Sequence, residues 1–180
     1  MRADAKRNYD KIVEVARQVF REKGYDAPLD EIAKKAGVGA GTLYRHFTTK
    51  DALLDAVMQA WVDSVGVATD KALAREGSPR DVLVGWFETY VHLVSSYKGN
   101  PAKITAALGD PDSPILTKCQ VLTSANGRVV EHLGGSLRPG VDPIQMARLV
   151  GGVATVADQA DLPSQAVRPL LEVVADGLLA

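Results

Sequence analysis

Helix start signals recur along this chain and constrain its fold more than any other feature. At four places a short polar residue precedes proline, which suits the first helical position because its φ is fixed and its missing N–H would be unpaired there. Glycines, which adopt the left-handed conformation that ends many helices, recur between these pairs. The pairs are Ser78-Pro79, Asn100-Pro101, Ser113-Pro114 and Asp142-Pro143.

Apolar residues between these signals recur at helical spacing, as in Ile12, Ala16, Val19 and Phe20. Sustained alternation typical of strands is missing from the sequence. The predicted fold class is therefore all-α. Because Pro169 falls inside the last expected helix, that helix either bends there or begins later. We expect nine helices, at residues 3–23, 28–36, 40–46, 49–76, 79–98, 101–109, 114–133, 143–160 and 164–179.

Composition narrows the possible classes of protein. The 180 residues are 46% hydrophobic and 24% charged, which is enough apolar sequence for a core and excludes a disordered chain. No apolar run is long enough to cross a membrane, and the first residues, MRADAKRNYD, are too charged for a secretion signal. We expect a soluble, cytoplasmic protein with no membrane partner. Cys119 is the single cysteine and no Cys/His cluster has zinc spacing, so no disulfide, metal or cofactor is predicted.

The net charge of −1 conceals an asymmetry along the chain. Residues 1–50 hold 11 Lys/Arg and 7 Asp/Glu, whereas residues 51–180 hold 10 and 15. The N-terminal part of the chain is therefore the part expected to bind a polyanion. A solvated basic helix face would give the same balance, so charge alone does not decide the partner.

The segment PLDEIAKKAGVGAGTLYRHF, which begins at Pro28, has the spacing of a helix-turn-helix unit. Ile32 and Ala36 lie on the apolar face of a short first helix, and Gly37 permits a tight turn after it. Leu43 anchors a second short helix. In units of this kind the second helix enters the DNA major groove.

Hydrogen-bond donors are concentrated in and after this second helix, behind small residues that allow close approach to DNA. Hydroxyl and cationic side chains of this kind bind phosphates and base edges. A packed helix surface is the other interpretation of Tyr44 and His46, but donors behind a glycine-rich turn serve little purpose in a core. The predicted DNA-binding residues are Ala40, Gly41, Thr42, Tyr44, Arg45, His46 and Lys50.

The stretch DEIAKKAGVGAGTLYRHFTTKDALLDAV resembles the DNA-binding signature of the TetR family of bacterial transcriptional regulators, and the match is close over residues 9–58. The resemblance implies a helix-turn-helix head (1–48), a connecting helix (49–77) and a ligand-binding, dimerising body (78–180). It also implies that Tyr44 contacts a phosphate or thymine methyl, that Thr42, His46 and Lys50 hold phosphates, and that Ala40, Gly41 and Arg45 face bases.

One position departs from the family pattern. Many members have Ser or Thr where this chain has Ala27-Pro28-Leu29, at the start of the first helix of the unit. A phosphate contact there would have to come from backbone amides. Because Ala40 and Gly41 have no hydrogen-bonding side chains, direct base recognition falls largely to Arg45, supplemented by DNA shape.

Helices 143–160 and 164–179 are apolar on more than one face. A helix that is apolar on two faces is buried on both, and in a chain this small we expect the second partner to be another subunit. An ordinary central core helix is the alternative. The predicted dimer-interface residues are Val150, Gly151, Ala154, Leu171, Val174 and Leu178.

Helix 79–98 holds several aromatic residues of the body. Aromatic rings with polar tips suit the wall of a small-molecule pocket, although core packing is the alternative for each one. No nucleophile–base motif is recognisable, so no catalytic residue is predicted. The predicted ligand-binding residues are Trp86, Phe87, Tyr90, Tyr97, Cys119 and Asn126.

These features predict a homodimeric regulator, not an enzyme, that binds a palindromic DNA operator as a repressor and is released by a small-molecule effector. In this interpretation the ligand moves the connecting helix so that the two heads no longer fit successive major grooves, about 34 Å apart. Two alternatives stay open. One is a regulator without a small ligand, whose body would be filled by side chains. The other is a small all-α enzyme or ligand carrier whose head does not bind DNA.

Overall fold

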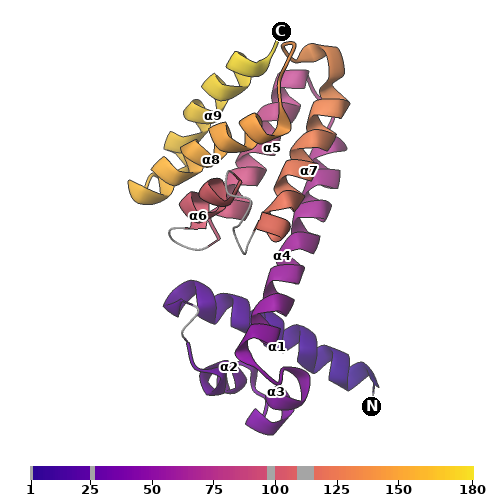
Figure 1. The fold of residues 1–180 in the computed structure, drawn as a ribbon, viewed down its shortest axis with the longest axis vertical. Coiled ribbons are helices and arrows are strands. Elements are labelled where there is room, and N and C mark those ends of the chain that lie inside the picture. The colour runs from indigo at the N-terminus through magenta and orange to yellow at the C-terminus, as the bar shows by residue number, and fades with distance from the viewer. Residues whose placement is uncertain (1, 25–26, 97–99, 109–115) are drawn as a thin grey trace. The chain divides into compact units, whose positions relative to one another are not determined.

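The described residues of the computed structural model, 2–24, 27–96, 100–108 and 116–180, form nine α-helices and one short 3-10 helix (Figure 1). An isolated antiparallel bridge between Leu137 and Leu179 is the one extended pairing among these residues. The all-α prediction is confirmed. The helices are α1 (Arg2–Lys23), α2 (Leu29–Ala36), α3 (Ala40–His46), α4 (Lys50–Leu73), α5 (Pro79–Val94), α6 (Asn100–Ala107), α7 (Leu116–Leu133), η1 (Gly134–Ser136), α8 (Pro143–Gln159) and α9 (Ser164–Leu178).

The chain divides into two compact units, Met1–Asp63 and Ser64–Ala180, so the division falls inside α4. We call the first unit the head and the second the body. None of the helices in the described part of the chain is long and apolar enough to span a membrane.

Two of the predicted start signals act as helix caps in the body. At the start of α5, Ser78 Oγ accepts from the Asp81 N–H at 3.2 Å, and the Asp81 carboxylate accepts from the Ser78 N–H at 3.1 Å. The Ser78 hydroxyl also donates to Asp81 Oδ2 at 2.6 Å, and this bond, together with the one from the Ser78 N–H, holds the pKa of Asp81 below its usual value. At α8, Asp142 Oδ1 accepts from the N–H groups of Ile144 and Gln145. Asn100 is itself the first residue of α6, and Ser113-Pro114 lies outside the described residues.

Two helices end three or four residues earlier than the sequence indicates. We expect α4 to reach residue 76 and α5 to reach 98, but they end at Leu73 and Val94. After α5, the Ser96 hydroxyl donates to the Leu93 carbonyl at 3.0 Å, an example of a serine side chain that competes for helix carbonyls. α9 includes Pro169 and begins at Ser164, so the proline does not mark its start.

Each unit has its own apolar core. In the head, Ile12, Phe20, Ile32 and Leu43 from α1, α2 and α3 are essentially inaccessible to solvent. Ion pairs from Lys23 to Glu31 and from Lys35 to Glu22 join α1 to α2 at the surface. The body core is built from α5, α7, α8 and α9, and its largest fully buried side chains include Trp86, Tyr90, Phe87, Leu122, Met146 and Leu171.

Candidate nucleic-acid interface

The turn between α2 and α3 fixes the direction of the second helix of the helix-turn-helix unit. Gly37 ends α2 with φ of +64°, a left-handed conformation that side chains disfavour. The Gly37 N–H donates to the Lys34 carbonyl at 3.1 Å, and the Val38 N–H donates to the Ala33 carbonyl at 3.0 Å. This pair of bonds is the Schellman arrangement of a helix end. α3 therefore leaves α2 at a set angle because residue 37 is glycine.

Burial determines which face of α3 turns outward. Leu43 is 0% exposed and Phe47 is 2% exposed, so both anchor α3 and its C-cap to the head core. Tyr44 is 45% exposed, and Arg45 is also exposed. The structure places the seven predicted DNA-binding residues on α3 and at the first residue of α4. Ala40 and Gly41 are exposed, whereas Thr42, His46 and Lys50 are half-buried.

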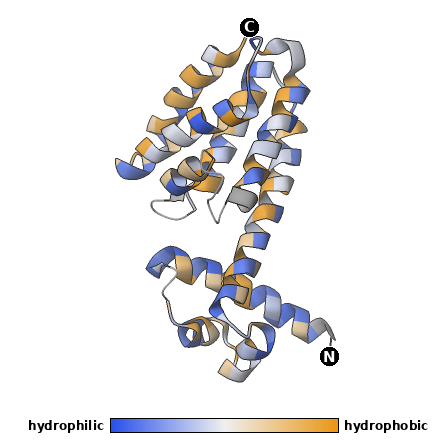
Figure 2. Cartoon of the chain, in the orientation of Figure 1, coloured by the Kyte–Doolittle hydropathy of each residue, from blue (hydrophilic) through white to orange (hydrophobic). Residues whose placement is uncertain are grey.

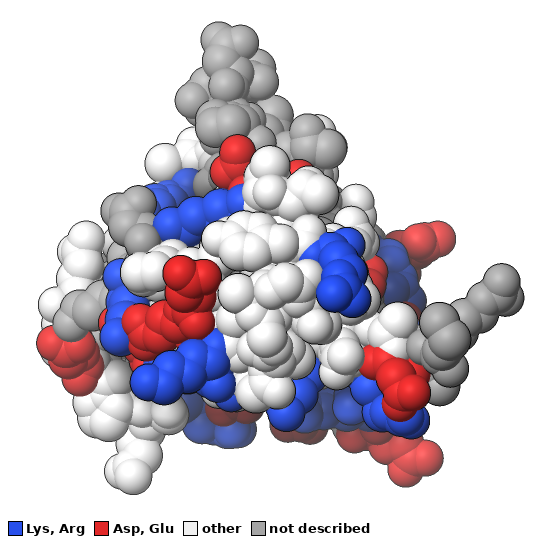
Figure 3. Space-filling view, turned by 90° about the horizontal axis from the view of Figure 1, so that it is seen from below, with Lys and Arg blue, Asp and Glu red and all other residues white. Residues whose placement is uncertain are grey.

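The start of α3 leaves room for a large partner. A Cβ added at Gly39 or Gly41 would meet no atom within 4 Å, so packing within the chain does not require glycine at either position. Figure 3 views the molecule from the end at which α2 and α3 lie in Figure 1, and shows Lys and Arg side chains around an uncharged area, with some acidic side chains among them. This surface has the small residues and cationic groups needed for close approach to a polyanion.

Tyr9 on α1 belongs to this surface, and the sequence reasoning missed it. Its ring centroid lies 5.0 Å from that of Phe47 and 6.1 Å from that of His46, with the imidazole nearly edge-on. Because Tyr9 is 39% exposed, it supports the end of α3 from the solvent side. The available signal is its spacing: Tyr9 precedes Ile12 by three residues, on the apolar stripe of α1.

The helix starts at the edge of this surface differ in their caps. Thr49 Oγ1 accepts from the Ala52 N–H at 3.1 Å at the start of α4, beside Lys50. Pro28 precedes α2 and provides no side-chain cap, as the sequence indicates. Any anion at the start of α2 would therefore meet backbone N–H groups only.

Three of the predicted ligand-binding residues, Trp86, Tyr90 and Asn126, are buried in the body core with their polar groups hydrogen-bonded, and we call them the closed cluster around Asn126. The Trp86 indole N–H donates to Asn126 Oδ1 at 2.7 Å, and the Asn126 amide donates to the Pro143 carbonyl at 3.2 Å. The Tyr90 hydroxyl donates to the Ala147 carbonyl at 3.4 Å. Burial raises the pKa of the Cys119 thiol to about 11, so the thiol is protonated near neutral pH. Phe87 of α5 is fully buried, and Tyr97 lies outside the described residues.

Four of the six predicted dimer-interface residues are buried in the core of the body within the single chain. Val150, Gly151, Ala154 and Leu171 are buried within the single chain, and only Val174 and Leu178 are half-buried. A Cβ at Gly151 would overlap Thr105 of α6, which explains the need for a small residue there. Both helices are hydrophobic along much of their length (Figure 2), so the pattern does not reveal which face is external. The exposed apolar side chains are Ile144, Leu149 and Val156 on α8 and Leu170 and Val173 on α9.

Comparisons with known proteins agree with this architecture. Residues 12–57 match the model of bacterial regulatory proteins of the tetR family, and residues 78–180 match that of the C-terminal domain of SbtR-like transcriptional regulators. An HTH-type transcriptional regulator of Staphylococcus aureus is 45% identical over 64 residues, and this match spans 35% of each chain. A TetR transcriptional regulator of Streptomyces coelicolor is similar over 95% of this chain and 98% of its own, with 30% identity and a TM-score of 0.70. One from Mycobacterium vanbaalenii is 29% identical over 99% of both chains, with a TM-score of 0.71. The chain therefore belongs to the TetR family of bacterial transcriptional regulators, which are DNA-binding proteins and not enzymes.

Proposed function

We propose that this regulator is a ligand-responsive repressor, a cytoplasmic homodimer that binds a palindromic operator and is released from it by a small-molecule effector. The observation that carries the proposal is the outward face of α3, where exposed Tyr44 and Arg45 follow two glycines with open space around them. Such a face suits insertion into the major groove.

The side chains of the head differ in the part of DNA that each is proposed to contact. Among the seven predicted residues, only Arg45 has a guanidinium group, which can donate two hydrogen bonds to the O6 and N7 atoms of guanine. Arg45 is therefore the residue proposed to recognise a base. Thr42, His46 and Lys50 are half-buried, and their hydroxyl, imidazole and ammonium groups are the proposed phosphate contacts. Tyr9 holds the imidazole of His46 in place through ring contact.

Exposed apolar side chains support the proposed dimer. Leu149, Val156, Leu170 and Val173 are between 40% and 72% exposed in the single chain. Pairing α8 and α9 with the same helices of a second copy would form a four-helix interface that removes this surface from water. Because two linked heads engage two half-sites together, dimerisation would raise the affinity for a palindrome far above that of one head.

The closed cluster around Asn126 favours a second candidate, a regulator whose body has no small-molecule ligand. Trp86, Tyr90 and Asn126 are almost inaccessible to solvent. Their polar groups form hydrogen bonds with one another or with nearby backbone carbonyls. A ligand among them would have to replace these bonds. A ligand can also release DNA only if it favours the non-binding state over the binding state.

Selection of bound fragments from a random DNA pool tests the proposed function. The expected product is an inverted repeat whose half-sites are centred about one helical turn apart, or a multiple of it. The control is the same selection with Arg45→Ala, which should enrich a less defined sequence. Enrichment of a single unrepeated site contradicts the proposed dimer, and no enrichment contradicts operator recognition.

A further inference from the structure

Three aromatic rings join the first helix of the head to the end of α3. Tyr9 belongs to α1, His46 is the last residue of α3, and Phe47 is the C-cap that follows it. The ring centroids of Tyr9 and Phe47 are 5.0 Å apart, those of Tyr9 and His46 are 6.1 Å apart, and those of His46 and Phe47 are 6.3 Å apart. All three spacings fall in the range of favourable aromatic pairs, about 4.5–7 Å. We call these three residues the ring cluster of the head.

Burial differs from one ring of the cluster to the next. Phe47 is 2% exposed and belongs to the core of the head, whereas Tyr9 is 39% exposed and His46 is half-buried. A core side chain is held in one rotamer by the close packing around it. Phe47 therefore gives the other two rings a rigid base, and those two rings reach the surface.

The ring contacts restrict the imidazole of His46. The planes of the Tyr9 ring and the imidazole are 70° apart, an edge-to-face arrangement, and the Phe47 ring is tilted by 44° against the imidazole. A side chain at the end of a helix without such contacts would sample several rotamers in solvent. The cluster therefore sets the direction of the imidazole N–H before any partner binds.

We propose that Tyr9 is a positioning residue for DNA binding, because its ring holds the imidazole of His46 in the orientation that donates to a phosphate. The inference rests on the proposed function for one point, that His46 contacts a phosphate. A donor that is held in place before binding loses less conformational entropy when it binds. Tyr9 thus contributes to DNA affinity from α1, a helix outside the helix-turn-helix unit.

A double-mutant cycle with the full-length protein and duplex DNA tests this role. Tyr9→Leu removes the ring and should lower the affinity for DNA about two- to tenfold for each head. In the His46→Ala background the same change should have almost no effect, because no imidazole is left to position. Lost packing between Tyr9 and Phe47 is common to both backgrounds, so the cycle cancels it. Because phosphate contacts do not depend on sequence, a random duplex is sufficient.

Two more variants separate the ring of Tyr9 from its hydroxyl and from the surface of α1 in general. Tyr9→Phe keeps the ring, so it should recover most of the affinity that Tyr9→Leu loses. Gln18→Leu changes an exposed residue of α1 nine positions later, on the opposite side of the helix, and should leave DNA affinity unchanged.

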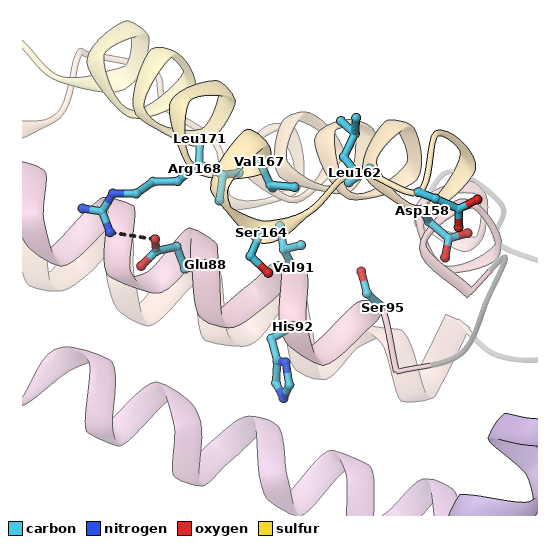
Figure 4. Close-up of a pocket in the computed structure, with 12 residues that line it drawn as sticks. Glu88, Val91, His92, Ser95, Asp158, Leu162, Ser164, Val167, Arg168 and Leu171 are labelled. Carbon is cyan, nitrogen blue, oxygen red and sulfur yellow. Dashed lines mark hydrogen bonds and ion pairs between the residues drawn. The ribbon is translucent and has the colours of Figure 1, made fainter.

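Proton NMR of the histidine side chains reports the ring contact in the absence of DNA. An aromatic ring shifts the resonances of nearby protons, so Tyr9→Leu should move the imidazole signals of His46, which are identified by their absence from the His46→Ala spectrum. The chain has two other histidines, His92 and His132, which are exposed residues of the body. The imidazole of His92 points away from α9 (Figure 4), and the signals of both residues should stay in place as internal references.

Three results would overturn the inference. They are equal losses of affinity from Tyr9→Leu in both backgrounds, His46 signals that do not move, and a loss in Tyr9→Phe as large as that in Tyr9→Leu, which would make the hydroxyl a direct DNA contact. Failure of the proposed function is a different result. A protein that binds random DNA with the expected coupling but selects no inverted repeat supports the positioning role and contradicts operator recognition, whereas a protein that binds no DNA contradicts both.

Discussion

Replacing Asn126 with leucine should destabilise the body although the two side chains are similar in volume. Asn126 is 1% exposed and accepts the Trp86 indole N–H at 2.7 Å. Leucine leaves this donor buried without a partner, at a cost of about 1–3 kcal/mol. It also removes the bond to the Pro143 carbonyl, a net loss of about 0.5–1.5 kcal/mol. The expected decrease in the free energy of unfolding is therefore about 1.5–4.5 kcal/mol.

A double-mutant cycle with Trp86→Phe isolates the indole bond. Phenylalanine has no N–H, so in that background Asn126→Leu should cost about 1–3 kcal/mol less than in the wild type. Urea unfolding followed by circular dichroism gives all four free energies. The protein concentration must be fixed, because the stability of a dimer depends on it.

Two results would refute this reasoning. Equal destabilisation by Asn126→Leu in both backgrounds would mean that the indole N–H does not depend on Asn126. A decrease below about 0.5 kcal/mol in the wild-type background would mean that water reaches the cluster, so that the donor is never left unpaired.

Four further predictions concern the head, the base reader, the dimer and a helix contact. If the Tyr44 hydroxyl binds a phosphate, Tyr44→Ala should weaken binding to all DNA sequences and lower the slope of log affinity against log salt concentration. An affinity equal to that of the wild type throughout a salt titration would contradict this phosphate contact. Arg45→Ala should reduce the preference for one base at one operator position by about 1–3 kcal/mol. If the variant instead loses equal affinity for specific and random DNA, Arg45 contacts a phosphate and not a base. Val173→Glu places a charge on the exposed face of α9 and should give a folded monomer in sedimentation, whereas a folded dimer would exclude this face from the interface. Gly151→Ala should lower stability by about 1–3 kcal/mol because its Cβ would overlap a side chain of α6, whereas Gly127→Ala, with no atom closer than 3.9 Å, should not lower it.

Local signals predicted the parts of the fold that local chemistry determines. The bounds of α3 were predictable from a glycine on one side and a core phenylalanine on the other. Ser78 and Asp142 form the N-caps of α5 and α8, as their position before proline predicts. The ends of α4 and α5 were not predictable to the residue. There, apolar periodicity continues toward the next glycine, while the hydroxyl of Ser96 competes for the last carbonyls of α5.

The surfaces of the body depend on contacts between distant segments, which one sequence does not reveal. α8 is apolar nearly all round, so periodicity did not show that Val150 faces the core and Leu149 faces outward. An ion pair likewise joins Glu88 of α5 to Arg168 of α9, which lie 80 residues apart in the chain. By contrast, the residues predicted to face DNA lie within one short segment, so a local sequence pattern is enough to nominate them.

The open space at the start of α3 has an evolutionary consequence. No atom of the chain lies within 4 Å of a Cβ at Gly41, and a helical glycine is less stable than most alternatives by about 1 kcal/mol. Serine, asparagine or glutamine at this position would therefore keep the fold, and if α3 enters the major groove as proposed it would add a group able to bind a base edge. On that proposal, descendants of this regulator could acquire new operators at this position without a compensating change elsewhere in the head.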